Sequence, residues 1–213
     1  MNYFLIANNK NIKEFTINKI SYNINNDILV LFNFLIPFHR FDKIKYYPNK
    51  ICVSRKRPTQ YRLYSTLFPE IKEYYCNMGI IKQYQDMFKE IYFLPCSYNI
   101  IENPQSYIDN IALFQFDTNK IKCIDYNLID MANKLQYFKT GIQAEVSTGI
   151  IVYEHIKTIK KSHDQIILVC FNSELTSHHD QEWETNYFFN EISLGKCLTI
   201  DCYNLPDSYS QTK

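Results

Sequence analysis

The sequence predicts a single α/β domain in which helices flank a mainly parallel central sheet. The chain has 213 residues, which suits one domain with a core large enough to need no disulfides. Hydrophobic residues make up 46% of it, including 18 Tyr and 15 Phe. Short apolar runs alternate with longer segments of helical periodicity, a pattern typical of strand–helix units in a parallel sheet. We find no internal repeat, so residues 1–213 are expected to form one domain, with a small helical insertion around 58–140.

Each expected element follows from its apolar spacing. The strands are short buried runs, expected at 3–7, 27–32, 50–54, 91–94, 165–171 and 197–200. Helices are expected where apolar residues recur every three or four positions, at 12–20, 69–78, 80–89, 128–138, 150–161 and 180–192. The stretch 96–127 is ambiguous, and a further strand is considered at 110–114.

Polar residues follow three of the expected strands. Asn8 and Asn9 follow the first, Asn33 ends the second, and Ser54 and Arg55 end the third. Ligands of open α/β sheets bind beyond the carboxyl ends of the strands. These residues are therefore candidates for a binding site by position alone.

The charge distribution argues against nucleic acid as a partner. The formal net charge is +1, whereas phosphate backbones are bound by concentrated basic fields. All four arginines nevertheless fall within 23 consecutive residues, at Arg40, Arg55, Arg57 and Arg62. Arginine suits bidentate binding of phosphate or carboxylate, but a solvated basic loop explains the cluster equally well.

The cysteines and the apolar runs indicate a soluble cytoplasmic protein. The seven cysteines are odd in number, show no CxxC spacing and lie partly in apolar runs, which favours buried reduced thiols over disulfides or zinc. The apolar run at the N-terminus is too short for a signal peptide, and no window approaches the roughly 18 apolar residues of a membrane span. A peripheral association with a membrane stays open.

A polar turn, Ser147-Thr148-Gly149, precedes one of the expected helices. Its hydroxyls, its glycine and the free N–H groups of a helix start can seat an anion or a phosphate. The alternative is an ordinary N-cap with a tight turn, which is the more frequent use of such residues.

A second candidate motif, His178-His179-Asp180, lies between an apolar strand and a helix. Adjacent side chains point in different directions, so one imidazole is available to take a proton from a hydroxyl. The carboxylates of Asp180, Glu182 and Glu184 can orient it. The alternative is a surface turn in which Asp180 caps the helix, and a metal site lacks a third ligand.

Several catalytic signatures are missing from the sequence. There is no Walker A motif, no GxGxxG, no GxSxG and no Asp-x-Asp pair. A nucleotide-sugar transferase built on this chain is therefore expected to work without a metal, with protein groups stabilising the leaving phosphate.

The order of these pieces resembles the bacterial sialyltransferases of glycosyltransferase family 42. The resemblance is carried by four short motifs spread over most of the chain: Phe4–Glu14, Phe32-Asn33-Phe34, Ser147-Thr148-Gly149, and Ile166–Phe171 followed by His178-His179-Asp180. It implies a Rossmann-like domain of a GT-A-like variant. It also implies a metal-independent, inverting transfer of sialic acid or a related sugar from a CMP-sugar to a glycan of lipooligosaccharide or capsule. The CMP-sugar would be the co-substrate, and no cofactor is expected.

The resemblance also assigns roles to residues. Asn8, Asn9 and Asn33 would hold the nucleotide, together with Arg55, while Ser147, Thr148 and Gly149 would line the nucleotide or donor sugar. His178 or His179 would deprotonate the acceptor. A glycolipid acceptor would place the protein at the inner membrane, and a homo-oligomer stays open.

The chain departs from the family in two places. The first turn reads Asn8-Asn9-Lys10, where members usually have Gly-Asn-Gly. Only residues 172–177 separate Phe171 from His178, in place of a long lid with tyrosines. The leaving-group role would then pass to Arg55, Arg57 or Tyr187. Two alternatives follow: a non-catalytic interaction module on a degraded transferase fold, or a transferase that uses a UDP- or GDP-sugar.

Overall fold

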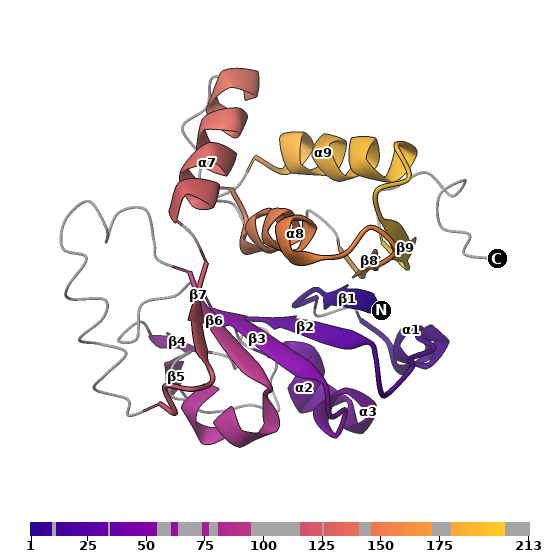
Figure 1. Cartoon of the computed structure of the whole chain (residues 1–213), viewed down its shortest axis with the longest axis vertical. Coiled ribbons are helices and arrows are strands. Elements are labelled where there is room, and N and C mark those ends of the chain that lie inside the picture. Colours follow the sequence, from indigo (N-terminus) through magenta and orange to yellow (C-terminus); the bar gives the residue numbers. More distant parts are fainter. Residues whose placement is uncertain are drawn as a thin grey trace.

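The computed structural model describes residues 1–9, 12–33, 35–54, 61–63, 74–76, 81–94, 116–124, 126–140, 146–171 and 180–202. Their main feature is a parallel sheet in the order β7-β6-β3-β2-β1-β8-β9 (Figure 1). Its strands are β1 (Asn2–Ile6), β2 (Ile28–Phe32), β3 (Lys50–Ser54), β6 (Glu90–Phe93), β7 (Ile121–Cys123), β8 (Gln165–Val169) and β9 (Leu198–Ile200). All six neighbouring pairs are parallel, which confirms the predicted Rossmann-like α/β fold.

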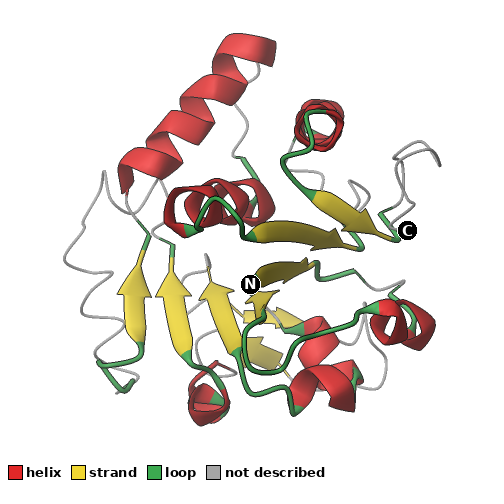
Figure 2. Ribbon diagram, turned by 45° about the vertical axis from the view of Figure 1, so that its right-hand side comes forward, coloured by secondary structure: helices red, strands yellow, loops and turns green. Residues whose placement is uncertain are grey.

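Helices cover both faces of this sheet (Figure 2). One face carries α1 (Glu14–Lys19), α2 (Ile36–Arg40) and α3 (Asp42–Lys45), and the other carries α7 (Tyr126–Thr140), α8 (Thr148–Ile159) and α9 (Gln181–Ser193). Side chains alternate along each strand, so Phe4 and Ile6 pack against the first group while Tyr3 and Leu5 pack against the second. Burial on both faces explains why the strands are continuous apolar runs.

The chain reverses its direction of strand addition beside β1. From β1 it proceeds through β2, β3, β6 and β7 toward one edge of the sheet. It then returns through α7 and α8 and adds β8 and β9 on the opposite side of β1. Crevices at such a reversal, at the carboxyl ends of the strands, are where doubly wound sheets bind ligands. The residues that follow β1 and β8 are therefore candidates for a binding site.

The described parts of the stretch 58–140, where a small helical insertion is expected, contain strands as well as helix α7. This stretch supplies β6 and β7 to the central sheet, and its residues 61–63 (β4) pair antiparallel with 74–76 (β5). The helix expected at 69–78 is wrong at 74–76, where Tyr-Tyr-Cys forms a strand, as aromatic residues favour. The strand considered at 110–114 lies outside the described residues. Of the second expected helix, 80–89, the described residues 81–83 are helical and Gln85–Met87 form the 3₁₀ turn η2.

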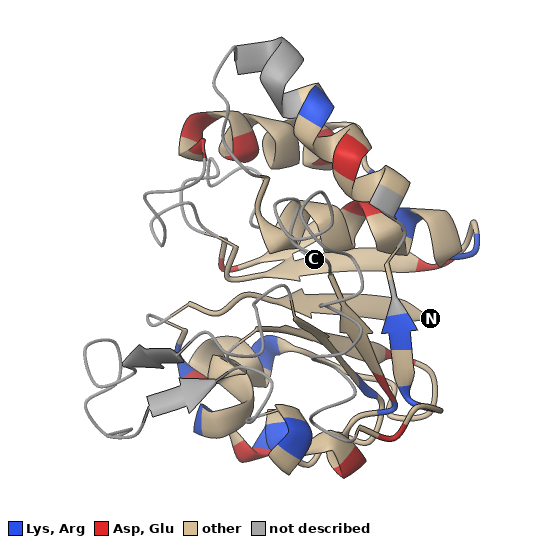
Figure 3. Ribbon diagram, turned by 90° about the vertical axis from the view of Figure 1, so that its left-hand side faces the viewer, with Lys and Arg blue, Asp and Glu red and all other residues tan. Residues whose placement is uncertain are grey.

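Charges of both signs lie on the helices on either side of the sheet (Figure 3). Within the described part of the chain, no helix has both the length and the apolarity needed to cross a bilayer.

A buried carboxylate, Glu191, connects α8, α9 and the start of β9. It accepts hydrogen bonds from the Tyr153 hydroxyl at 3.0 Å, from Lys157 Nζ at 2.9 Å and from Lys196 Nζ at 2.8 Å. Burial by itself would raise the pKa of this carboxyl, but the hydrogen bonds from Lys196, Lys157 and Tyr153 outweigh it and lower the pKa below the usual value. The charge is therefore retained and fully partnered, as a buried charge must be.

Replacing this carboxylate should destabilise the fold. We expect Glu191→Gln to lower the free energy of unfolding at pH 7 by roughly 2 kcal/mol, because two ammonium groups with access to water lose an ionic acceptor. Since the folded-state pKa is lowered, the native contribution is complete above the usual Glu value of 4.5 and fades as the pH falls below it. Urea unfolding curves of both proteins should therefore converge in acid. The matched control is exposed Glu182→Gln on the same helix, and an equal loss there would contradict the assignment.

Candidate functional site

The N-terminal ends of α8 and α9 are joined at the carboxyl edge of the sheet. Ser147 caps α8, with its hydroxyl accepting from the Ile150 N–H at 3.4 Å. The Ser147 N–H itself donates to Glu184 Oε1, in the first turn of α9, at 2.7 Å. This hydrogen bond gives Glu184, which the sequence suggests as a partner of the histidines, a contact with the start of α8.

This end of α8 is suited to an anion. Thr148 and Gly149 are the first two residues of the helix and are half-buried. Among the hydrogen bonds of the described residues, none uses their N–H groups, as expected for a helix start. Unpaired N–H groups and the helix dipole together favour a negatively charged group here.

Gly149 is required by the ring of Phe171, which follows β8. A Cβ at position 149 would lie 2.8 Å from Phe171 Cε1, well inside contact distance. The same ring packs edge-on against Phe32, at 5.9 Å between centroids, and against Phe188, at 5.3 Å. Phe171 therefore connects the ends of β2 and β8 with α8 and α9, whereas sequence patterning identifies it only as the end of a strand.

Asn8 joins the end of β1 to the end of β2. Its Nδ2 donates to the Phe32 carbonyl at 2.6 Å, and its Oδ1 accepts from the N–H of Ile36, the first residue of α2, at 3.1 Å. Both ends of this amide are thus used within the protein. A nucleotide contact through the Asn8 side chain would have to share one of these groups.

Asn9 joins the two strands at the reversal. It is fully buried, and its Nδ2 donates to the Cys170 carbonyl, directly after β8, at 3.2 Å. The described contacts therefore place Asn9 between β1 and β8, beneath the candidate site.

Strained backbone conformations gather at the same edge. In the described residues, the non-glycine positions with positive φ are Asn33 (41°), Leu35 (56°), Cys170 (54°) and Asp201 (47°). Each follows the carboxyl end of a strand: β2 for the first two, β8 for Cys170 and β9 for Asp201. Such conformations cost about 1 kcal/mol or more each and are concentrated at functional sites.

Beside β8, Cys170 and Asp201 form a small polar cluster with α1. Asp201 accepts from the Thr16 hydroxyl at 2.5 Å and from Lys19 Nζ at 2.8 Å. Burial by itself would raise the Asp201 pKa, but Lys19 and Thr16 outweigh it and lower that pKa. Burial raises the pKa of the Cys170 thiol to about 12, so this thiol is neutral and unsuited to act as a nucleophile.

The proposed catalytic residues His178 and His179 lie outside the described residues, as do Arg55, Arg57 and Lys10. The residue after the histidine pair, Asp180, caps α9 and accepts from the Trp183 N–H at 2.9 Å. Tyr187, considered for the leaving group, instead donates its hydroxyl to Glu154 on α8. Asn33 lies half-buried beside the site, with its N–H bonded to the Val53 carbonyl at 2.8 Å.

The described side chains include no group of three residues that could hold a metal ion. At the described edge, the N-terminus of α8 lies next to the first turn of α9.

Comparisons with protein-family models, with curated proteins and with solved structures gave no match.

The contact between Gly149 and Phe171 gives a direct test of the site's packing. Gly149→Ala should lower the free energy of unfolding by roughly 1–2 kcal/mol, because the new methyl group collides with the ring. In the background of Phe171→Leu, which removes the ring, the same change should be neutral or stabilising, since Ala is the better helix former. A double-mutant cycle from urea unfolding measures the coupling. Equal effects in both backgrounds would show that Phe171 does not determine the glycine.

Proposed function

We propose that this protein is a metal-independent glycosyltransferase that binds a CMP-activated sugar at the carboxyl edge of its sheet. The observation that carries the proposal is the hydrogen bond from the Ser147 N–H to Glu184. It brings the anion-seating end of α8 to the first turn of α9, directly after the His178-His179 pair in sequence. In this proposal, a phosphate seat at the start of α8 and a base from the segment before α9 would lie at one edge of a doubly wound sheet.

The chemistry follows from these groups. The N–H groups of Thr148 and Gly149 would receive the phosphate of the donor and stabilise the charge that develops on it as it leaves. One of the two histidines would accept the proton of the acceptor hydroxyl. The acceptor oxygen then forms a bond to the anomeric carbon, the bond from that carbon to the phosphate oxygen breaks, and CMP departs with inversion. The acceptor would be a glycan or a glycolipid.

A binding module without catalysis is the second candidate, and two observations favour it. The Phe171 ring covers Gly149, and both ends of the Asn8 amide are used within the protein. In such a module the carboxyl edge would have the same structure but would not bind a nucleotide.

Nucleotide binding separates these candidates. We expect CMP to raise the melting temperature of the protein in EDTA as much as in Mg²⁺, because the seat consists of backbone N–H groups. Differential scanning fluorimetry with CMP, UMP, GMP and AMP at matched ionic strength measures this. A larger shift with UMP or GMP would indicate a UDP- or GDP-sugar donor. The absence of any nucleotide-dependent shift would overturn the transferase and leave the binding module.

Turnover distinguishes the two histidines. His178→Gln and His179→Gln should both retain the CMP-induced shift, while one of them lowers kcat about a hundredfold or more, the usual contribution of a general base. The assay is release of CMP from a CMP-sugar in the presence of acceptor. His163→Gln is the matched control, because His163 is exposed and precedes β8 at the opposite edge of the sheet. Full activity in both variants would exclude a histidine base.

A further inference from the structure

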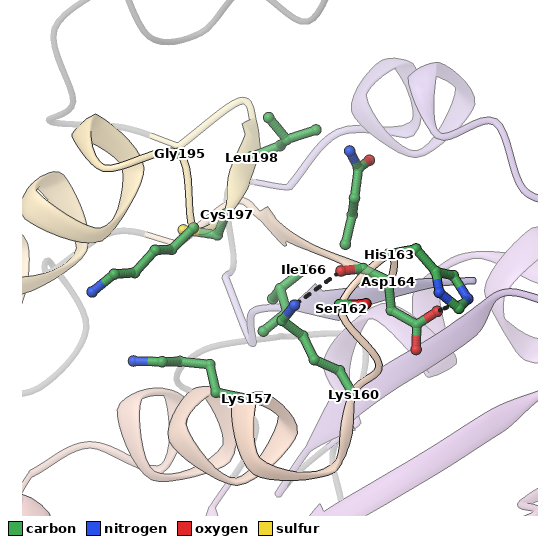
Figure 4. A pocket seen from close by; sticks show the side chains of 11 residues that line it. Lys157, Lys160, Ser162, His163, Asp164, Ile166, Gly195, Cys197 and Leu198 are labelled. Carbon is green, nitrogen blue, oxygen red and sulfur yellow. Dashed lines mark hydrogen bonds and ion pairs between the residues drawn. The ribbon is translucent and has the colours of Figure 1, made fainter.

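A pocket opens at the opposite edge of the sheet, where β8 and β9 begin. Its volume is about 470 Å³. Lys157 and Lys160 lie on one wall, at the end of α8, while Gly195, Cys197 and Leu198 lie on the facing wall (Figure 4). Nothing in the proposed transfer reaction uses this end of the molecule.

The lining is rich in ammonium groups. Lys157, Lys160 and Lys196 contribute three, against the single carboxylate of Asp164. Asp164 has other partners. Its Oδ1 lies 3.4 Å from the N-terminal amine and 3.4 Å from His163 Nε2, and its Oδ2 accepts a hydrogen bond from the Lys161 N–H at 2.9 Å. Its charge is therefore already balanced without the three lysines.

The hydrogen bonds of the three lysines leave donors unused. Lys157 donates to Glu154 and Glu191, and Lys196 donates to Glu191. Lys160 Nζ donates to the carbonyl oxygens of Lys161 and Asp164, at 3.4 and 3.1 Å, and pairs with none of the described carboxylates. Each ammonium group has three N–H donors, so at least one remains on each lysine.

The arrangement favours a compact anion with several oxygens. Lys157 and Lys196 bind the two oxygens of one Glu191 carboxylate, which holds their ammonium groups close together although they come from different walls. Burial by itself would lower the Lys157 pKa, but Glu154 and Glu191 outweigh it and raise that pKa, so the charge is permanent near neutral pH. Lysine binds phosphate oxygens as a compact point charge with three donors.

We propose that this pocket, formed by Lys157, Lys160 and Lys196, is a binding site for a phosphate monoester group. The group can belong to a soluble phosphorylated metabolite or to the headgroup of an anionic lipid, which share this chemistry. The site is separate from the nucleotide edge, and α8 reaches from one to the other.

Titration with inorganic phosphate at constant ionic strength, followed by NMR of the full chain, tests the site. Phosphate should shift the amide signals of residues 160–163 and 195–197 in a saturable way and leave those of α7 unchanged. Lys160→Gln should weaken this binding about tenfold or more, and Lys160→Arg should retain it. The matched control is Lys122→Gln, an exposed lysine on β7 at the far edge of the sheet, which should bind like the wild type.

Vesicles distinguish the two sources of phosphate. A lipid headgroup is indicated if the protein co-sediments with phosphatidic acid vesicles but not with phosphatidylcholine vesicles, and if Lys160→Gln abolishes this co-sedimentation. A soluble ligand is indicated if the protein binds free phosphate saturably and does not co-sediment with either kind of vesicle. The proposal is overturned if neither probe depends on Lys160, or if phosphate shifts signals over the whole surface. CMP binding at the other edge is measured separately, so either proposal can fail without the other.

Discussion

The rest of the structure depends on the central position of β1. This strand is hydrogen-bonded in parallel to β2 on one side and to β8 on the other, although about 160 residues separate β1 from β8 in the chain. Both faces of β1 are buried, so the strand must be apolar throughout, and the chain must leave it at the carboxyl edge through polar residues. Asn8 and Asn9 meet this requirement: one amide binds the end of β2, and the other binds the end of β8. The reversal of strand order, and with it the candidate site, is held by these two side chains.

Helices α8 and α9 are connected by hydrogen bonds near both of their ends. At the carboxyl edge of the sheet, Glu184 accepts from the Ser147 N–H; at the opposite edge, Glu191 accepts from Tyr153, Lys157 and Lys196. Between these points the two helices share a core that includes Ile150, Phe188 and Ile192. Glu191 is buried and needs such partners to keep its charge, whereas Glu184 is half-buried. These contacts connect α8 and α9 at the two edges where the anion sites are proposed.

The sequence predicts those elements whose pattern depends on local spacing. Continuous apolar runs identify six of the seven central strands, and helical periodicity identifies α8 and α9 within two residues at each end. The elements that such patterns miss are either too short to show a period or contain a residue, such as proline, that usually interrupts a helix. Strand β7 has three residues, too few for a pattern, and α2 contains Pro37, which is tolerated only because it lies in the first turn. At the site, sequence finds the cap Ser147 by its type, but the pairing of Ser147 with Glu184 and the closeness of Gly149 to Phe171 arise between segments distant in the chain.

The distribution of left-handed backbone positions argues that the carboxyl edge is more than a set of turns. At the opposite edge, the turn between α9 and β9 uses Gly195 at φ 67°, where a Cβ would meet nothing within 4 Å and no side chain is needed. Glycine adopts this conformation without steric cost. At the carboxyl edge the described chain instead places Asn33, Leu35, Cys170 and Asp201 in the same conformation, each with a side chain that glycine would remove. Backbone hydrogen bonds hold three of them: from Asn33 to Val53, from Leu35 to Phe32 and from Cys170 to Ile200. Among the described non-glycine residues this conformation occurs only at the carboxyl edge, and strain of this kind is concentrated at functional sites.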